Sequence, residues 1–377
     1  MILRTFGWSL GVTVIALGLA FWYGGLNGVA IATILAVLEI SLSFDNAVVN
    51  ATVLERMNDF WQKIFLTIGI AIAVFGMRML FPLLIVGLTA QLGPVEAVNL
   101  ALNDGARYGQ LLGEAHPAIA AFGGMFLMML FLDFIFEERE ITWLSWLERP
   151  LARIGKLDQL SVVVSLVALV VAAENLAPTE KVSTVMVSGA LGLVTYVAVN
   201  GLGDLFSAGG GDLIDEENAG IHGGPDIVAN VVAPTGRPGA VVKQVGKAAF
   251  FLFLYVEVLD ASFSFDGVIG AFAITSDPII IAIGLGIGAM YIRSLTVYLV
   301  KQGTLAEYRY LEHGALYAIG ALSVLLLLTM KYEVPEVVTG MIGIGFIAAA
   351  LVSSLVRNRR EGSRDAAAQH DKVRSGT

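Results

Sequence analysis

The sequence contains no cysteine and few charged residues. The absence of cysteine excludes disulfide bonds and thiolate ligands for soft metal ions. Charged residues make up only 15 % of the 377-residue chain, whereas soluble domains carry roughly 25 %. The net charge of −9 gives no support for binding to nucleic acid. Hydrophobic residues are abundant instead, at 56 % of the chain, with a mean hydropathy of +0.78.

Apolar runs near 20 residues long recur along the whole chain. About 20 helical residues cross a hydrocarbon core roughly 30 Å thick, so these runs predict an all-α polytopic membrane protein. We expect about ten transmembrane helices, at approximately 7–24, 28–54, 63–88, 117–136, 159–174, 182–203, 247–274, 278–300, 313–330 and 335–356.

The segments between these spans divide the chain into two membrane halves. Residues 204–246 are rich in glycine, aspartate and proline, which predicts a polar cytoplasmic loop. A helix at 141–156 alternates large apolar side chains with basic ones, so we expect it to lie in the membrane interface. The predicted parts are a first half at 1–203 (repeat one 28–136, connecting spans 159–203), a second half at 247–356 (repeat two 247–330, final span 335–356) and a disordered polar tail at 357–377.

The distribution of lysine and arginine predicts the orientation. With ten spans and a cytoplasmic N-terminus, 18 of the 23 basic residues fall in cytoplasmic segments and only three in external ones. The positive-inside rule therefore favours cytoplasmic N- and C-termini, in a bacterial-type inner (plasma) membrane. The other two basic residues, Arg78 and Arg293, fall inside predicted spans.

An acidic motif occurs twice inside apolar runs. The first copy reads EISLSFDN from Glu39 and the second reads DASFSFDG from Asp260. An offset of 221 residues places Glu39 on Asp260 and Asp45 on Asp266. A charge within a membrane span costs about 2.5–3.5 kcal/mol or more, so such residues indicate a functional site.

The duplication extends beyond the acidic motif. Arg78 lies in the third predicted span and Arg293 in the eighth. The fourth and ninth spans begin with the same pattern, His-x-Ala-aliphatic-x-Ala-apolar-Gly, headed by His116 and His313. Spans two to four thus match spans seven to nine, and the odd shift of five spans predicts an inverted repeat with its site at the repeat interface. The alternative is chance similarity between hydrophobic helices.

The spacing of the two acids leaves two arrangements open. Six residues on an unbroken helix separate Glu39 from Asp45 by 120° and about 9 Å. Either the helix breaks at Ser41–Ser43 and brings both acids together, or the two motif helices run antiparallel. The second arrangement, which we prefer, places Glu39 near Asp266 and Asp45 near Asp260.

Clustered carboxylates in a dry site repel one another, and a divalent cation removes that repulsion. Oxygen ligands suit hard ions such as Mn²⁺, Ca²⁺ and Mg²⁺. The candidate metal ligands are Glu39, Asp45, Asn46, Glu257, Asp260 and Asp266, with Ser43, Asn50 and Ser264 as further oxygen donors. Arg78 and Arg293 are candidate gating or charge-neutralising residues, and the alternative is that they only form structural ion pairs with these acids.

The same motifs resemble the TerC family. The resemblance rests on E-x-x-D-x-x-F-S-x-D at Glu257–Asp266, F-A-I-T-x-D-P at Phe272–Pro278, Arg-Ser-Leu at Arg293–Leu295 and L-S-x-D-N-A at Leu42–Ala47. The length and central loop are closer to a TerC-related branch known only as a domain of unknown function. The resemblance implies a transporter of the lysine-exporter superfamily, linked to manganese export, metal homeostasis and tellurite resistance.

Two positions depart from the family pattern. A Ser-Asn pair before the arginine is replaced by Gly284-Leu285, and Ser-Ile-Pro after the second aspartate by Gly267–Ile269. A lost polar ligand affects the identity of the ion more than the ability to bind one.

These observations predict a divalent metal transporter that exports Mn²⁺ by alternating access, with Ca²⁺ or Mg²⁺ as other candidate substrates and protons as a plausible counter-ion. We expect no enzyme, since no H-E-x-x-H or G-x-S-x-G motif occurs. The alternatives are a membrane-embedded metal-dependent enzyme and a non-transporting scaffold of a metal or tellurite stress complex.

Overall fold

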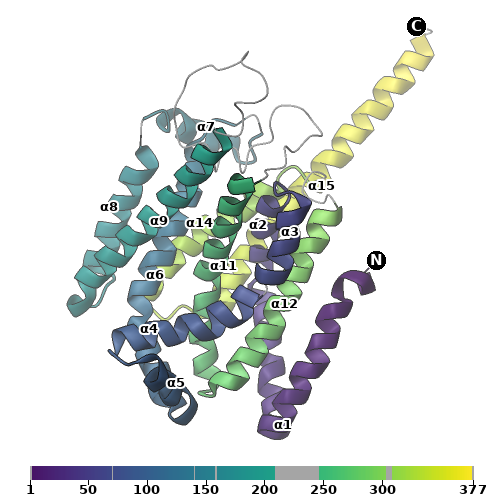
Figure 1. Cartoon of the computed structure of the whole chain (residues 1–377). Helices are drawn as coiled ribbons and strands as arrows, with labels where there is room; N and C mark the ends of the chain where they lie inside the picture. The colour runs from purple at the N-terminus through teal and green to yellow at the C-terminus, as the bar shows by residue number, and fades with distance from the viewer. Residues whose placement is uncertain are drawn as a thin grey trace.

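The computed structural model describes residues 2–69, 71–139, 141–157, 159–208, 246–302 and 308–375, and these ranges contain helices and no strands (Figure 1). The predicted loop at 204–246 falls almost wholly outside them. The helices are α1 (Ile2–Leu42), α2 (Phe44–Leu54), α3 (Asp59–Ile64), η1 (Phe65–Gly69), η2 (Ile72–Leu80), α4 (Phe81–Thr89), α5 (Pro94–Asn103), α6 (Gly105–Phe136), α7 (Ser145–Ile154), α8 (Leu160–Asn175), η3 (Thr179–Lys181), α9 (Val182–Ala208), α11 (Gly246–Ile274), α12 (Pro278–Gln302), α14 (Leu311–Thr329) and α15 (Glu336–Ser375).

The all-α membrane architecture is confirmed. Seven helical segments of the described chain are long and apolar enough to cross a membrane. The larger predicted number partly reflects α1, a single apolar segment that holds predicted span 7–24 and the first part of predicted span 28–54. The two parts are joined at Gly25, whose φ of 60° breaks the helix. Predicted span 159–174 is the 16-residue helix α8, which is short for a span, and predicted span 247–274 is the acid-bearing helix α11.

The third predicted span, 63–88, is not a single α-helix. Its middle is π-helical in η1 and η2, which carry five and nine residues. Long π-helical runs are rare, and shorter ones occur mostly at functional sites. The ribbon of α4 runs across the other helices after this stretch (Figure 1). The apolar pattern of 63–88 does not distinguish a π-helix from an α-helix, because it fixes only burial.

Two further boundaries differ from prediction. Helix α6 begins at Gly105 rather than near 117, so Pro117 lies inside it; the polar residues before Pro117 extend the helix past the apolar span. The tail expected to be disordered continues α15 as a helix to Ser375 and projects from the bundle (Figure 1). That tail contains alanine and arginine and no proline, a composition that permits a helix.

Helices α6 and α14, which both contain the repeated histidine pattern, pack against each other in opposite directions. His116, in the first half of α6, lies 3.3 Å from the hydroxyl of Thr329 at the end of α14. Phe134, near the end of α6, contacts His313 at the start of α14, with ring centroids 5.3 Å apart. This antiparallel pairing is what an inverted repeat requires.

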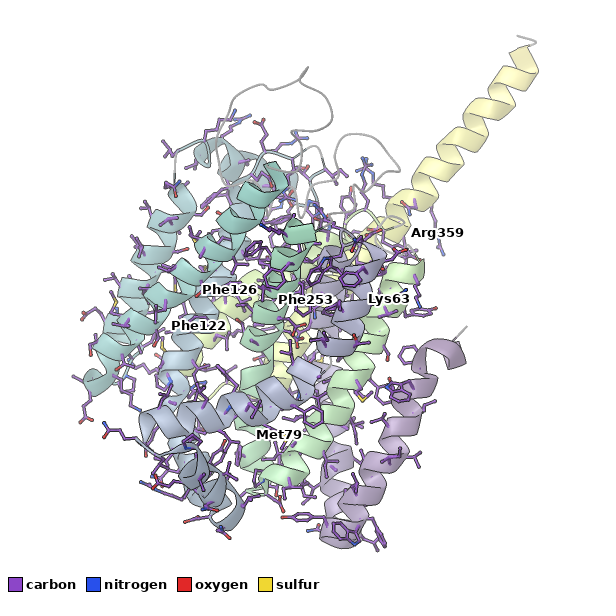
Figure 2. All side chains as sticks on the ribbon, viewed as in Figure 1. Lys63, Met79, Phe122, Phe126, Phe253 and Arg359 are labelled. Atoms are coloured by element: carbon purple, nitrogen blue, oxygen red, sulfur yellow. The ribbon has the colours of Figure 1, made fainter. Side chains whose placement is uncertain are left out.

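A buried apolar cluster surrounds this pair and joins it to α9 and α11. Phe126 of α6 and Phe253 of α11 belong to it and lie inside the bundle (Figure 2). The other face of several helices is apolar and exposed, as with Trp22 and Leu26 of α1, at 84 % and 79 % exposure. Exposed apolar surface of this extent fits contact with lipid.

Helix α1 packs closely on α12 along glycines. A Cβ at Gly284 would lie 2.7 Å from Cβ of Leu35 and 2.9 Å from the carbonyl oxygen of Ala32. A Cβ at Gly288 would collide with the side chain of Glu39. Small residues at such a contact let two membrane helices approach. The close approach of α1 therefore gives a packing reason for glycine at 284.

We predict that Gly284→Leu destabilises the bundle, whereas Gly18→Leu does not. The larger side chain at 284 overlaps α1, and overpacking of this kind costs about 1–3 kcal/mol. Gly18 is a matched control, because a Cβ there meets nothing within 4 Å. The measurement is the free energy of unfolding of detergent-solubilised protein in a denaturant titration. Equal stabilities of the two variants would contradict the α1–α12 contact.

Candidate functional site

The first buried ion pair joins Glu39 of α1 to Arg78 of η2. One Nη of Arg78 donates to Oε1 of Glu39, and the other donates to the carbonyl oxygen of Ala73 at 2.7 Å. Both charged side chains are at most 5 % exposed. The π-helical stretch therefore positions Arg78 so that it binds its own backbone and the acid of the first motif together.

The second ion pair lies at the corresponding place in the other half. Arg293 of α12 donates to Glu257 of α11 at 3.2 Å and to Asp260 at 3.4 Å. It also donates to the carbonyl oxygen of Phe65 at 3.0 Å, and its guanidinium lies 4.1 Å from the centre of the Phe65 ring. Its side chain is 2 % exposed. One arginine thus contacts two acids of α11.

The two pairs meet at one cavity. It is lined by Glu39, Ser43, Asn46, Arg78, Asp260, Ala289, Ile292 and Arg293. Its volume is about 10 Å³, counted as space for the centre of a water-sized sphere. A single water needs roughly 10–15 Å³ on this measure. Residues of both halves therefore converge on a space of about one water molecule.

Asn50 of α2 connects the halves beside this cavity. It is fully buried, and its Nδ2 donates to Oδ1 of Asp260 at 3.4 Å. Its own Oδ1 has no hydrogen-bond partner among the described residues, and the same holds for Nε of Arg78 and Nε of Arg293. Buried polar atoms without partners are uncommon, and they indicate a polar ligand, a water or another conformation.

A helix break lies at Ser43, as in the arrangement that the sequence left open but did not favour. Helix α1 ends at Leu42, Ser43 has φ −98° and ψ 18°, and α2 begins at Phe44. Asp45 and Asn46 therefore lie in the first turn of α2. Asn46 is buried on the cavity.

The preferred pairing of Glu39 with Asp266 and of Asp45 with Asp260 remains a prediction. Both Asp45 and Asp266 belong to described helices, but their side chains lie outside the described part of the structure. The backbone is compatible with the first pairing, since Oε2 of Glu39 is 3.1 Å from the place of a Cβ on Gly267.

The described acids do not form a cation cage in this conformation. No group of three or more carboxylate or histidine side chains at metal-binding separation occurs within the described chain. Glu39, Glu257 and Asp260 contact guanidinium groups instead. The chemistry present is a set of oxygen donors that two arginine side chains already contact.

The sequence did not indicate the role of Gly69 in η1. A Cβ at this glycine would lie 2.6 Å from Oε1 of Glu257 and would collide with Arg293. The glycine thus lets the backbone of η1 press against the second ion pair. It stands in an ordinary apolar run, so no sequence pattern singles it out.

The architecture and these buried charges define a multi-pass helical membrane protein with a polar centre shared by two opposed repeats. A family model matches residues 44–361, and the chain belongs to that family, described as "Protein of unknown function (DUF475)". No curated protein matches the chain, and no solved structure matches it.

Arg293→Gln is expected to lower the free energy of unfolding by about 3–5 kcal/mol, because it leaves two buried acids without a cation. Adding Glu257→Gln should restore part of the loss, which a double-mutant cycle in detergent measures. Lys156→Gln is the control, since its pair with Glu138 is exposed, with N and O 3.2 Å apart, and an exposed pair contributes at most about 1 kcal/mol. If Arg293→Gln costs no more than the control, the buried pair is not structural.

Proposed function

We propose that this protein transports a divalent cation across a bacterial-type plasma membrane, with Mn²⁺ as the first-choice substrate, exported by alternating access. One observation carries the proposal. Glu39 and Asp260, equivalent residues of two opposed halves, line the same buried cavity, and each contacts an arginine. Inverted-repeat transporters hold their substrates between the repeats in this way.

The chemistry of the cavity suits a hard cation. Carboxylate oxygens of Glu39 and Asp260 and the side-chain oxygens of Ser43 and Asn46 are the kind of ligand that Mn²⁺, Ca²⁺ and Mg²⁺ take. Glu257 lies one helical turn before Asp260. The proposed ligand set is completed by Asp45 and Asp266, which the sequence motif supplies.

Arg78 and Arg293 act in this proposal as surrogate cations. They neutralise the carboxylates when the ion is absent, which lowers the cost of burying those charges. An entering cation must displace both guanidinium groups, so binding is coupled to movement of η2 and α12. Protonation of the acids would release the ion, which makes protons a suitable counter-ion.

The TerC resemblance supports manganese as the substrate. The acids that the resemblance assigns to the metal are Glu39, Asp45, Asp260 and Asp266, with Asn46 beside them. Membership in a family of unknown function neither adds to this assignment nor opposes it.

A second candidate is a non-transporting membrane scaffold. It is favoured by the small volume of the cavity and by arginines that already neutralise Glu39 and Asp260. In that case the buried charges would serve to specify the helix packing.

Metal flux into proteoliposomes separates the two candidates. The wild-type protein is expected to move Mn²⁺, in competition with Ca²⁺ and Mg²⁺, and Asp260→Asn and Glu39→Gln should each reduce the initial rate at least about tenfold, since each removes a charged ligand worth several kcal/mol. Glu138→Gln, an exposed acid, should leave the rate unchanged.

Size-exclusion profiles should show that each variant remains folded in detergent. If both cavity variants transported Mn²⁺ at the wild-type rate, Glu39 and Asp260 would not form the transport site. The absence of flux of all three ions in the wild type would remove transport and support the scaffold.

A further inference from the structure

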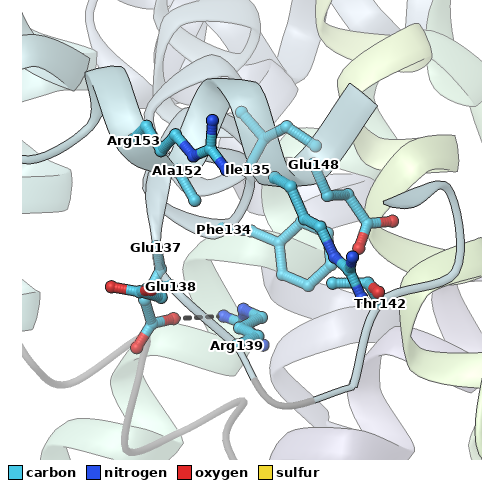
Figure 3. A pocket seen from close by; sticks show the side chains of 10 residues that line it. Phe134, Ile135, Glu137, Glu138, Arg139, Thr142, Glu148, Ala152 and Arg153 are labelled. Carbon is cyan, nitrogen blue, oxygen red and sulfur yellow. Dashed lines mark hydrogen bonds and ion pairs between the residues drawn. The ribbon is translucent and has the colours of Figure 1, made fainter. Parts of the chain in front are cut away.

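A second cavity, lined by other residues than the first, lies where the chain leaves α6 and enters α7. Its volume is about 180 Å³, far more than the roughly 10–15 Å³ that one water needs. Charged residues dominate its lining (Figure 3), namely Glu137, Glu138, Arg139, Glu148, Arg149 and Arg153.

Two of the lining acids are already paired. Glu137 accepts from Nη2 of Arg139 at 2.5 Å, the contact drawn as a dashed line in Figure 3. Glu138 lies 3.2 Å from Nζ of Lys156, in an exposed pair. Neither carboxylate therefore needs a cation from outside the protein.

The third acid, Glu148, is buried and holds the start of α7. Its carboxylate accepts from the backbone N–H of Leu144 at 2.8 Å and from that of Trp143 at 3.2 Å. It also accepts from the hydroxyl of Tyr317 at 3.1 Å. These donors satisfy the hydrogen-bonding capacity of the Glu148 carboxylate within the protein.

Among the lining arginines, Arg139 is paired with Glu137, and Arg149 and Arg153 remain. Arg149 and Arg153 stand four residues apart on α7, so they share one face of the helix. Both are exposed, and neither has an ion pair among the described residues. Arg139 is 9 % exposed, and its buried Nε has no hydrogen-bond partner in the described chain. The planar guanidinium group of an arginine can donate two parallel hydrogen bonds to phosphate oxygens, so arginines that line a cavity suit an anionic phosphate.

The position of α7 indicates which phosphate would reach this cavity. Its neighbouring apolar side chains are exposed, with Trp146 at 75 %, Ile154 at 50 % and Leu157 at 63 %. A short helix with exposed tryptophan and arginine lies where lipid headgroups are, and basic pockets at this depth bind anionic headgroups.

We propose that this cavity binds the phosphate of an anionic phospholipid headgroup, held by Arg149 and Arg153, with Arg139 behind them. The quaternary ammonium of a choline lipid would meet the same arginines and be repelled. The inference does not depend on metal transport, because the two cavities share no lining residue.

The test uses the full chain in a neutral detergent and three soluble probes: dioctanoyl phosphatidylglycerol, dioctanoyl phosphatidylcholine and inorganic phosphate. Phosphatidylglycerol should bind at least tenfold more tightly than phosphatidylcholine, and millimolar phosphate should compete with it. The double variant Arg149→Gln/Arg153→Gln should weaken phosphatidylglycerol binding at least tenfold. Arg107→Gln, an exposed arginine at the start of α6, is the matched control and should bind like the wild type.

Three results would overturn the proposal. If the double variant bound phosphatidylglycerol as tightly as the wild type, Arg149 and Arg153 would not be part of the lipid site. Equal binding of the two lipids would remove the charge selectivity. If the protein bound inorganic phosphate but not phosphatidylglycerol, the cavity would be a site for a free anion and not for a lipid headgroup. Because both substitutions are on the surface of α7, the variant should keep the wild-type size-exclusion profile.

Discussion

Burial of guanidinium groups against carboxylates is the constraint around which the helix bundle is arranged. Arg293 is among the largest fully buried side chains of the described protein. A charge in that place is tolerated only when partners surround it. The free-energy cost of moving a charge out of water is much larger than a single ordinary polar contact can offset. The surrounding helices meet that requirement with acids, with backbone carbonyls and with an aromatic ring.

The backbone near each arginine is shaped to fit it. The π-helical turns of η2 bring the carbonyl of Ala73 within reach of Arg78. At η1, the carbonyl and ring of Phe65 contact Arg293, and Gly69 leaves the space that its guanidinium occupies. Irregular helix geometry is thus concentrated where charge is buried, in keeping with where π-turns usually occur.

The sequence was sufficient for the helical membrane class and for the duplication. Apolar run length alone predicts spans, and the acid at Glu39 and its counterpart Asp260 do reach a shared cavity. The turn at Asp277 was also predictable, because aspartate before proline caps a helix, and its carboxylate accepts from the N–H of Ile279 at 2.9 Å. Local patterns of this kind follow from chemistry within a few residues.

What escaped prediction depends on contacts between distant helices. Nothing in the spacing of Arg78 and Arg293 says which acids they contact, since a long side chain on one helix can reach several others. The π-helical segment was equally hidden, because hydrophobic periodicity does not report hydrogen-bond register. The need for glycine at 284 and 288 comes from the approach of α1, a feature of the assembled bundle alone.

The way the charges are partitioned has a mechanical consequence. Glu39 and Arg78 both belong to the first repeat, whereas Glu257, Asp260 and Arg293 belong to the second. Across the boundary run hydrogen bonds from Asn50 to Asp260 and from Arg293 to the Phe65 carbonyl. A hydrogen bond to a charged group contributes about 1.5–3 kcal/mol to stability. Breaking such a bond therefore costs less than separating the two members of a buried ion pair. A hinge that opens along this boundary can move each arginine in one rigid body with the acids that it contacts, so the space between the halves is exposed without separating a guanidinium from its carboxylate partners.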